Sequence, residues 1–307
     1  MKEQPLFSII IPHYNIPDLL MRCLGSIPVH PDFQVIVVDD CSPNAETYLS
    51  TYPQLSRPYL EYYTTAQGGS AGRARNVALS HAQGRWLICL DADDLFTPEA
   101  ESLLRREADN PADVLFFGYR SVLSDDLNTP AKRNLYQKLF VQYAKDHDDR
   151  PLRYQFEAMW GKVFRRSMVE EHQIRCDETR YSNDVTFSLL CGIYARQTAV
   201  FTEPLFLITS REDSLASAQV HHRKGSVAER EIRLLVTLRA QKLVDEHHIR
   251  FDTKKYEYTS YMFWNEHPCA FWRFYFQQFL HYPNTLLRIA RYYLHSKHGE
   301  WVMQHKQ

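Results

Sequence analysis

The sequence lacks the features that mark secreted, nucleic-acid-binding and membrane-spanning proteins. Its 307 residues include six cysteines, none of them in a CxxC pair, so we expect no disulfide framework and a reducing compartment. Lysine and arginine number 36 against 37 acids, so no net charge favours nucleic acid or an anionic membrane. No apolar run approaches the ~20 residues of a membrane span. We therefore expect a cytoplasmic protein that binds any charged ligand at a local site.

The first 120 residues alternate between strand and helix signals, which is typical of an α/β protein. Continuous apolar runs such as LFSIIIP, residues 6–12, predict strands that are covered on both faces. Such alternation favours a mostly parallel central sheet flanked by helices. The predicted strands span 6–12, 33–40, 59–65, 85–91 and 113–120, and the predicted helices span 17–27, 44–52, 68–84 and 97–109.

The rest of the chain gives weaker signals and a change of character near residue 216. We expect a helix within 154–174, a second helix over 182–196, and a strand, a turn and a strand over 199–212. Beyond residue 216 the sequence becomes amphipathic and dense in aromatics, which predicts a helical C-terminal extension. The predicted domains are thus a catalytic domain, 1–215, with halves at 1–120 and 121–215, and the extension, 216–307.

Acidic residues follow two of the predicted buried strands. Asp91 and Asp93 end the fourth strand, and Asp39 and Asp40 end the second. Ligands of parallel sheets bind beyond the carboxyl ends of the strands, and paired carboxylates suit Mg²⁺ or Mn²⁺ together with substrate phosphates. The alternative for each pair is a solvated polar turn that caps the next helix.

A glycine-rich turn, QGGSAGRARN at residues 67–76, leads into the third predicted helix. It matches neither GxGxxG nor GxxxxGK[ST], so it is neither a dinucleotide fingerprint nor a P-loop. Its backbone N–H groups, with Arg73 and Arg75 near a helix N-terminus, nevertheless suit a diphosphate. The alternative is a flexible turn with two surface arginines.

Four motifs follow one another in the first 100 residues: SIIIPHYN (8–15), VIVVDDCS (35–42), GGSAGRARN (68–76) and LICLDADDLFTP (87–98). In this order and spacing they resemble the nucleotide-sugar half of family 2 glycosyltransferases, which have the GT-A fold. The resemblance covers residues 6–120 and continues less strongly to about 215 through WGKVFRR and SNDVTF.

The resemblance implies a role for each matching residue. Asp184 falls where the family has its catalytic base, although the usual Glu-Asp pair is here Asn183-Asp184. Asp91 and Asp93 resemble the DxD motif, whose second acid reaches a Mn²⁺ or Mg²⁺ ion. Arg211 matches a segment that closes the site in relatives, with a phosphate contact as its predicted role. The implied nucleotide-sugar-binding residues are Pro12, Tyr14, Asn15, Asp39, Asp40, Gly69, Arg75, Asn76, Asp91, Ala92 and Asp93, and the implied acceptor-side residues are Trp160, Gly161 and Lys162.

The resemblance also implies the reaction. It is a metal-dependent, inverting transfer of one sugar from a nucleoside-diphosphate sugar, UDP-linked by preference, to a glycan or lipid-linked acceptor in cell-surface polysaccharide synthesis. Arg288, Lys297 and nearby residues suggest peripheral association with the inner face of a membrane. Two alternative functions stay open: a catalytically inactive nucleotide- or glycan-binding relative, and a nucleotidyltransferase. For Trp160, a place in the apolar core stays open as the alternative to an acceptor-side role.

Overall fold

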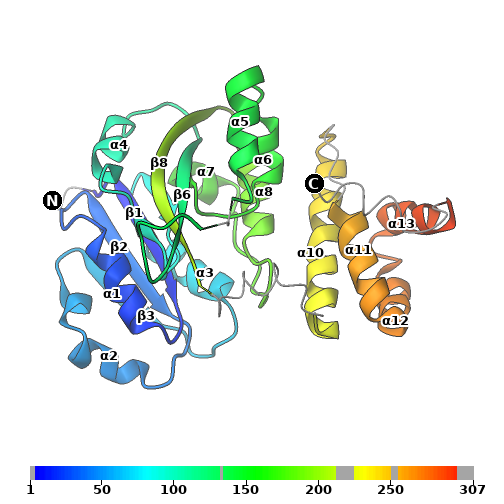
Figure 1. Ribbon diagram of the computed structural model, residues 1–307, viewed down its shortest axis with the longest axis horizontal. Helices are drawn as coiled ribbons and strands as arrows, with labels where there is room; N and C mark the ends of the chain where they lie inside the picture. Colours follow the sequence, from blue (N-terminus) through cyan, green and yellow to red (C-terminus); the bar gives the residue numbers. More distant parts are fainter. Residues whose placement is uncertain (1–3, 132–133, 212–224, 250–254, 296–307) are drawn as a thin grey trace. The chain divides into compact units, whose positions relative to one another are not determined.

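The computed structural model describes residues 4–131, 134–211, 225–249 and 255–295 (Figure 1). The chain divides into two compact units, Met1–His221 and His222–Gln307, which are described separately. The predicted domain boundary at 215–216 lies outside the described residues, as do Lys297 and His298 of the predicted membrane-associated segment.

The first unit contains an eight-stranded sheet in the order β3-β2-β1-β4-β7-β6-β8-β5. β1 and β2 are buried along their whole length, as their apolar sequences predict. The strands are β1 (Phe7–His13), β2 (Phe33–Asp39), β3 (Leu60–Thr64), β4 (Trp86–Cys89), β5 (Leu95–Phe96), β6 (Val114–Leu123), β7 (Lys162–Arg165) and β8 (Thr198–Ser210).

Helices flank the sheet in the first unit and form all the regular structure described in the second. In the first unit they are α1 (Pro17–Gly25), α2 (Ala45–Thr51), the short 3-10 helix η1 (Pro53–Ser56), α3 (Ala71–His81), α4 (Ala100–Arg106), α5 (Gln137–Asp146), α6 (Arg150–Gln155), α7 (Arg166–Glu171) and α8 (Val185–Tyr194). In the second unit they are α10 (Val227–Glu246), α11 (Lys255–Glu266), α12 (Pro268–Gln278) and α13 (Pro283–His295).

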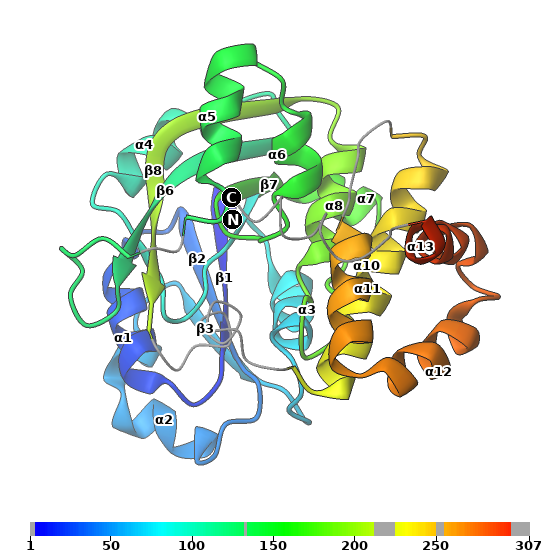
Figure 2. The same cartoon turned by 45° about the vertical axis from the view of Figure 1, so that its right-hand side comes forward.

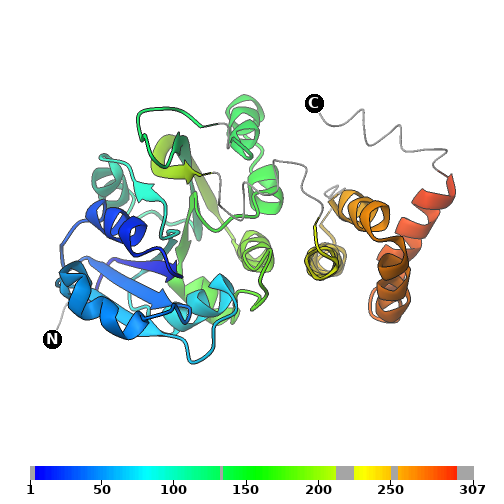
Figure 3. The same ribbon diagram turned by 60° about the horizontal axis from the view of Figure 1, so that its bottom comes forward.

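The N-terminal half of the sheet is parallel, as the sequence predicts. β2 pairs in parallel with β1 and β3, and β1 pairs in parallel with β4. The chain moves from β1 to β3 in one direction and then returns to β4, so right-handed connections put α1 and α3 on opposite faces (Figure 3). The strand order therefore reverses between β1 and β4, which is where ligands of such sheets bind.

The second half of the sheet is mixed. The helix expected within 154–174 is the short α7, but the strand β7, which was not predicted, precedes it, lies between β4 and β6 and is antiparallel to both. The segment 199–212 is not two strands but the single long β8, which runs beside β6 (Figure 2). A register shift at Gly118 accommodates Pro204, so the predicted turn is a β-bulge.

The second unit has its own apolar core. Leu234 and Leu238 of α10 pack with buried aromatic residues of α11 and α12, among them Phe263, Phe271 and Phe274. The extension is therefore helical, as its amphipathic sequence predicts. Within the described residues, no helix is both long enough and apolar enough to cross a membrane.

Candidate functional site

The residues after β1 lie at the carboxyl edge of the sheet, beside the point where the strand order reverses. Pro12 is a buried residue of β1, whereas the side chain of Tyr14 is 57% exposed. Asn15 has a positive φ of 51°, and its backbone N–H donates to Ser42 Oγ at 2.7 Å. The loop after β1 is thus fixed to the loop after β2, and Tyr14 is left open to a ligand.

Asp39 is part of a buried network at the ends of β1 and β2. Its Oδ2 lies 2.6 Å from His13 Nδ1, and its Oδ1 accepts the backbone N–H of Ser42 at 2.6 Å. The N–H of Ile16 donates to His13 Nε2, so His13 carries its own proton on Nδ1 and donates it to Asp39. Burial opposes the charge on Asp39, but these hydrogen bonds outweigh it and lower its pKa.

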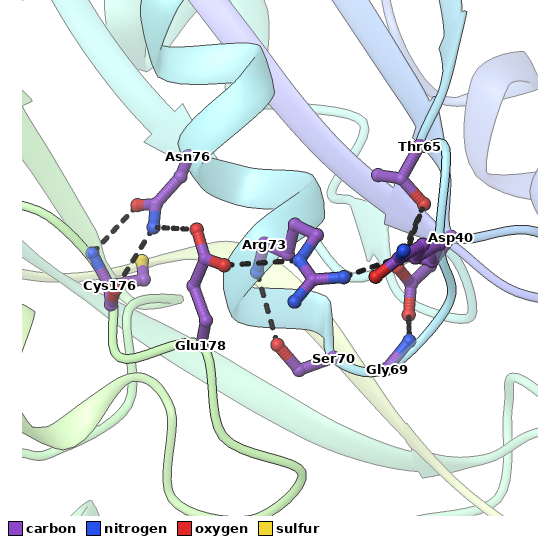
Figure 4. Close-up of polar contacts among 9 residues, drawn as sticks. Asp40, Thr65, Gly69, Ser70, Arg73, Asn76, Cys176 and Glu178 are labelled. Carbon is purple, nitrogen blue, oxygen red and sulfur yellow. Dashed lines mark hydrogen bonds and ion pairs between the residues drawn. The ribbon is translucent and has the colours of Figure 1, made fainter.

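Asp40 holds the glycine-rich turn (Figure 4). Its Oδ2 accepts the backbone N–H of Gly69 at 2.9 Å, and its Oδ1 accepts the hydroxyl of Thr65 at 3.1 Å. Ser70 then caps α3 by accepting the N–H of Arg73 at 3.2 Å. Asp40 thereby connects the end of β2 to the start of α3, the two elements predicted to bind the nucleotide.

Arg75 joins two distant parts of the sequence. On the buried side of α3, its guanidinium donates to Asp91 Oδ1 and to Asn183 Oδ1, each at 2.6 Å. Burial opposes its charge, but Asp91 more than compensates and raises the pKa of Arg75. The DxD segment and the segment before α8 are therefore linked through one permanently charged side chain.

The outer side of α3 is tied to residues 176–178. Asn76 Nδ2 donates to the carbonyl of Cys176 at 3.0 Å, and Asn76 Oδ1 accepts the Cys176 N–H at 2.8 Å (Figure 4). Glu178 accepts from Arg73 at 3.0 Å. A Cβ at Gly72 would lie 2.0 Å from the carbonyl oxygen of Asp177, so only glycine permits this close approach.

The DxD segment is a turn between β4 and β5, along which partly exposed and buried side chains alternate. Ala92 is buried, whereas the side chains of Asp91 and Asp93 are 31% and 20% exposed. Asp93 Oδ2 lies 3.2 Å from Arg211, just after β8. Asp94 is buried, and its Oδ1 accepts the N–H of Thr209 at 2.7 Å. Two of the three acids therefore remain accessible, while the third fixes the turn to β8.

Asp184 lies at the N-cap position of α8, next to Asn183. Burial raises the pKa of its carboxyl, partly offset by the nearby charge of Arg75, while Glu157 and Asp91 add to the rise. The same guanidinium that binds Asp91 thus acts on Asp184. The structure brings the two acids into one electrostatic environment.

The three predicted acceptor-side residues belong to the interior. The ring of Trp160 is largely buried against Tyr119, Tyr136 and Phe156. Gly161 has φ of +77°, and a Cβ there would lie 2.5 Å from the Phe156 ring. Lys162 is fully buried and donates to the Phe156 carbonyl, and its burial lowers its pKa to about 7. Any effect of these residues on an acceptor is therefore exerted from beneath the surface.

A cavity of about 720 Å³ lies beside this aromatic cluster. Tyr119, which packs on Trp160, forms part of its wall, together with Asn128, Asn134 and Gln137. Its lining thus combines an aromatic ring with amide groups. It contains none of the residues that the sequence predicts for the donor and acceptor sites.

Several residues that shape the site escaped prediction. His13 could have been found, because it ends β1 exactly in register with Asp39 at the end of β2. Thr209 and Arg22, which contact the DxD turn, come from β8 and α1 and are far from it in sequence. No local pattern signals such contacts, since they depend on the order of the strands.

Relatives of known sequence match about two thirds of the chain. EpsH of Bacillus subtilis, a protein named as a glycosyltransferase, is 23% identical over 219 residues, which cover 66% of this chain and 60% of EpsH. The poly(ribitol-phosphate) beta-N-acetylglucosaminyltransferase TarS of Staphylococcus aureus is 24% identical over 223 residues, which cover 70% of this chain and 37% of TarS. The chain thus spans about three fifths of EpsH and less of TarS.

Solved structures share the fold. A structure of TarS residues 1–349 with UDP-GlcNAc has a TM-score of 0.60 at 19% identity, covering 85% of this chain and 71% of that one. A structure of the mannosyltransferase PcManGT of Pyrobaculum calidifontis with GDP-Man and Mn²⁺ has a TM-score of 0.52 at 14% identity, covering 98% of this chain and 84% of that one. At these identities the likeness establishes the GT-A fold.

The family assignment depends on a match over more than half of the chain. Residues 8–173 match the family described as glycosyl transferase family 2. This range includes all four motifs, the Arg75–Asp91 contact and the buried aromatic cluster around Trp160. The chain belongs to glycosyl transferase family 2.

Proposed function

We propose that the protein is an inverting glycosyltransferase that moves one sugar from a UDP-sugar to a hydroxyl of a glycan or lipid-linked acceptor. The observation that carries this proposal is the bridge made by Arg75, whose guanidinium contacts Asp91 and Asn183, the residue before Asp184. It joins the DxD segment to the segment that contains the candidate base, and ligands of such sheets bind where the strand order reverses.

The nucleotide belongs at the ends of β1 and β2 and at the start of α3. Tyr14 offers an exposed ring for the base. Asp40 is the acid proposed to meet the uracil and ribose, with Asp39 fixed beneath it by His13. Arg75 adds a positive charge near the diphosphate. These residues bind and orient the donor without reacting.

The residues of the DxD turn fit a hard divalent cation such as Mn²⁺ or Mg²⁺. Asp93 and Asp91 are accessible carboxylates, and each now faces a guanidinium that compensates its charge. Among the described residues, no three acidic, histidine or cysteine side chains cluster as a metal site. Such cations are commonly held by one or two carboxylates together with substrate phosphates and water, which is the set that the DxD turn and the donor would offer. When bound, the cation would stabilise the negative charge that develops on the leaving diphosphate.

Asp184 is the proposed general base. Burial raises its pKa, which makes the ionised carboxylate a stronger proton acceptor than an exposed aspartate. It accepts the proton of the attacking acceptor hydroxyl at Oδ1 or Oδ2. One base on the side opposite the leaving group corresponds to a single displacement, which inverts the anomeric centre.

The relatives guide the choice of donor and acceptor. TarS was crystallised with UDP-GlcNAc and is named for a polymeric acceptor, whereas PcManGT was crystallised with GDP-Man and Mn²⁺. We propose UDP as the nucleotide of the donor, with GDP as the alternative. The proposed setting is cell-surface polysaccharide synthesis at the cytoplasmic face of a membrane. Peripheral membrane association and the acceptor-side role of Trp160, Gly161 and Lys162 stay part of the proposal.

The test combines UDP titration, with and without Mn²⁺, with release of UDP from UDP-sugars. Asp93→Asn should abolish both transfer and Mn²⁺-dependent UDP binding, whereas Asp184→Asn should abolish transfer alone. Asp125→Asn, in the exposed loop after β6, is the matched control and should change neither. A wild-type protein that binds no nucleotide under any condition would favour an inactive relative and refute the proposal.

A further inference from the structure

The C-terminal end of α1 contacts the backbone of the DxD turn and of β5. Cys23 Sγ lies 3.8 Å from the carbonyl oxygen of Asp91, and Arg22 Nη2 donates to the carbonyl of Asp93 at 3.0 Å. Ser26, the residue after α1, accepts the N–H of Phe96 in β5 at 3.0 Å through its Oγ. Two residues of α1 thus hold the backbone of the segment that carries the proposed metal ligands.

Arg22 makes the central contact of this set. Besides the Asp93 carbonyl, its guanidinium donates to the hydroxyl of Ser124 at 3.2 Å and to the Ser124 carbonyl. Ser124 directly follows β6. One planar, multidentate group therefore connects α1, the DxD turn and the end of β6, a geometry that lysine cannot reproduce.

The carbonyl of Asp93 is held from two sides. The hydroxyl of Thr209, near the end of β8, donates to the same oxygen at 2.9 Å. Both acceptor positions of this carbonyl are thereby used, whereas the Asp93 carboxylate points to Arg211. The backbone of Asp93 is fixed, and its carboxylate remains the accessible part of the residue.

We propose that Arg22 is a positioning residue, which fixes the direction in which Asp93 presents its carboxylate to a divalent cation bound with the donor diphosphate. The inference rests on the proposed function. Residues that orient a metal ligand typically change metal affinity by ~10- to 100-fold when they are removed. Arg22 does so through the peptide carbonyl, because its hydrogen bonds in the described part of the chain go to the carbonyls of Asp93 and Ser124 and to the Ser124 hydroxyl.

The competing explanation is that Arg22 only holds the fold together. Arg57 provides the matched comparison, because its guanidinium also donates to backbone carbonyls, those of Leu24 and Ile27 at 2.7 and 3.3 Å. Leu24 lies in the last turn of α1 and Ile27 just after the helix, and within the described residues Arg57 makes no hydrogen bond to the DxD turn. Loss of Arg57 should therefore lower stability without a specific effect on the cation.

The experiment measures Mn²⁺ binding to the full chain in the presence of saturating UDP, by the electron paramagnetic resonance signal of free Mn²⁺. UDP binding without metal and the thermal midpoint are measured for the same variants. Arg22→Ala should raise the dissociation constant for Mn²⁺ about tenfold, with UDP binding in the absence of metal unchanged. Arg22→Lys should give a smaller increase, and Arg57→Ala should lower the thermal midpoint and leave Mn²⁺ binding as in the wild type.

Thr209→Val keeps the inference testable if Arg22→Ala does not fold, because it removes the second donor to the same carbonyl and should also weaken Mn²⁺ binding. The inference is overturned if the folded Arg22 or Thr209 variants bind Mn²⁺ within twofold of the wild type, or if Arg57→Ala weakens it equally. Wild-type protein that binds UDP but shows no effect of Mn²⁺ would overturn this inference and leave the nucleotide site standing. Failure to bind UDP at all would instead refute the proposed function.

Discussion

At the scale of single residues, the site depends on arginines that compensate carboxylates. Arg75 is buried and contacts Asp91, and Arg211 contacts Asp93. A partly buried charge is costly unless an opposite charge or hydrogen bonds compensate it. Each arginine supplies that compensation to one acid of the turn.

The pH dependence of transfer should reveal Asp184. A base works only when it is ionised, so kcat/KM should fall as the pH falls through its pKa, which burial raises above the ordinary ~3.9 of aspartate. Arg75 lowers that pKa, so Arg75→Met should move the acidic limb of the profile to higher pH, whatever its effect on the maximum rate.

Arg73→Met is the control for this prediction. Arg73 lies on the same helix, but it is more exposed and pairs with Glu178. Its loss should leave the position of the acidic limb unchanged. An acidic limb that stays in place, or moves to lower pH, in Arg75→Met would contradict the assignment of Asp184 as the base.

At the scale of elements, hydrogen bonds join α3 to residues 176–178, and the two backbones approach each other closely at Gly72. Gly72→Ala would place a methyl group 2.0 Å from the Asp177 carbonyl oxygen, which cannot move without its chain. We expect a loss of ~1–3 kcal/mol in the free energy of unfolding, as for other overpacked sites, measured by urea denaturation.

Gly25→Ala is the matched control, because a Cβ at Gly25 would have no atom within 4 Å. It should be neutral or should stabilise the protein by a few tenths of a kcal/mol, since alanine restricts the unfolded chain. Equal free energies of unfolding for Gly72→Ala and the wild type would contradict the close approach of α3 to Asp177.

The elements that could be predicted are those whose stability is signalled locally. β1 and β2 are continuous apolar runs, and the acids after β2 and β4 lie at the carboxyl edge as predicted. β7 and β5 could not be predicted, because β7 has a charged residue at each end and β5 has only two residues, so neither contains an apolar run like that of β4. Trp160 illustrates the same limit: an exposed stacking ring and a core ring have the same sequence pattern, and only its packing on Tyr119 distinguishes them.

At the scale of the whole molecule, the two units have separate apolar cores. All residues proposed to bind the donor belong to the first unit. We expect two thermal transitions. UDP with Mn²⁺ should raise the midpoint temperature of only one of them, because binding at a ligand concentration 100 times the dissociation constant adds ~2.7 kcal/mol to the free energy of unfolding. Differential scanning calorimetry provides the measurement.

The Asp93→Asn variant is the control for this measurement, since it should show both transitions and no effect of Mn²⁺ on either. A ligand-induced shift of both transitions would mean that the second unit takes part in donor binding or unfolds together with the first. Either result would contradict a donor site confined to the first unit.

The bulge that accommodates Pro204 also affects how the chain behaves at high concentration. β5 is the edge strand, and among the described residues it pairs with β8 only at Phe206 and Leu207, so the residues of β8 before Phe206 have no partner strand on that side. Pro204 has no N–H to offer, and Thr97 occupies its carbonyl oxygen at 2.8 Å. With the charged Glu203 beside it, this border is a poor template for another strand, so the fold carries its own protection against edge-to-edge aggregation.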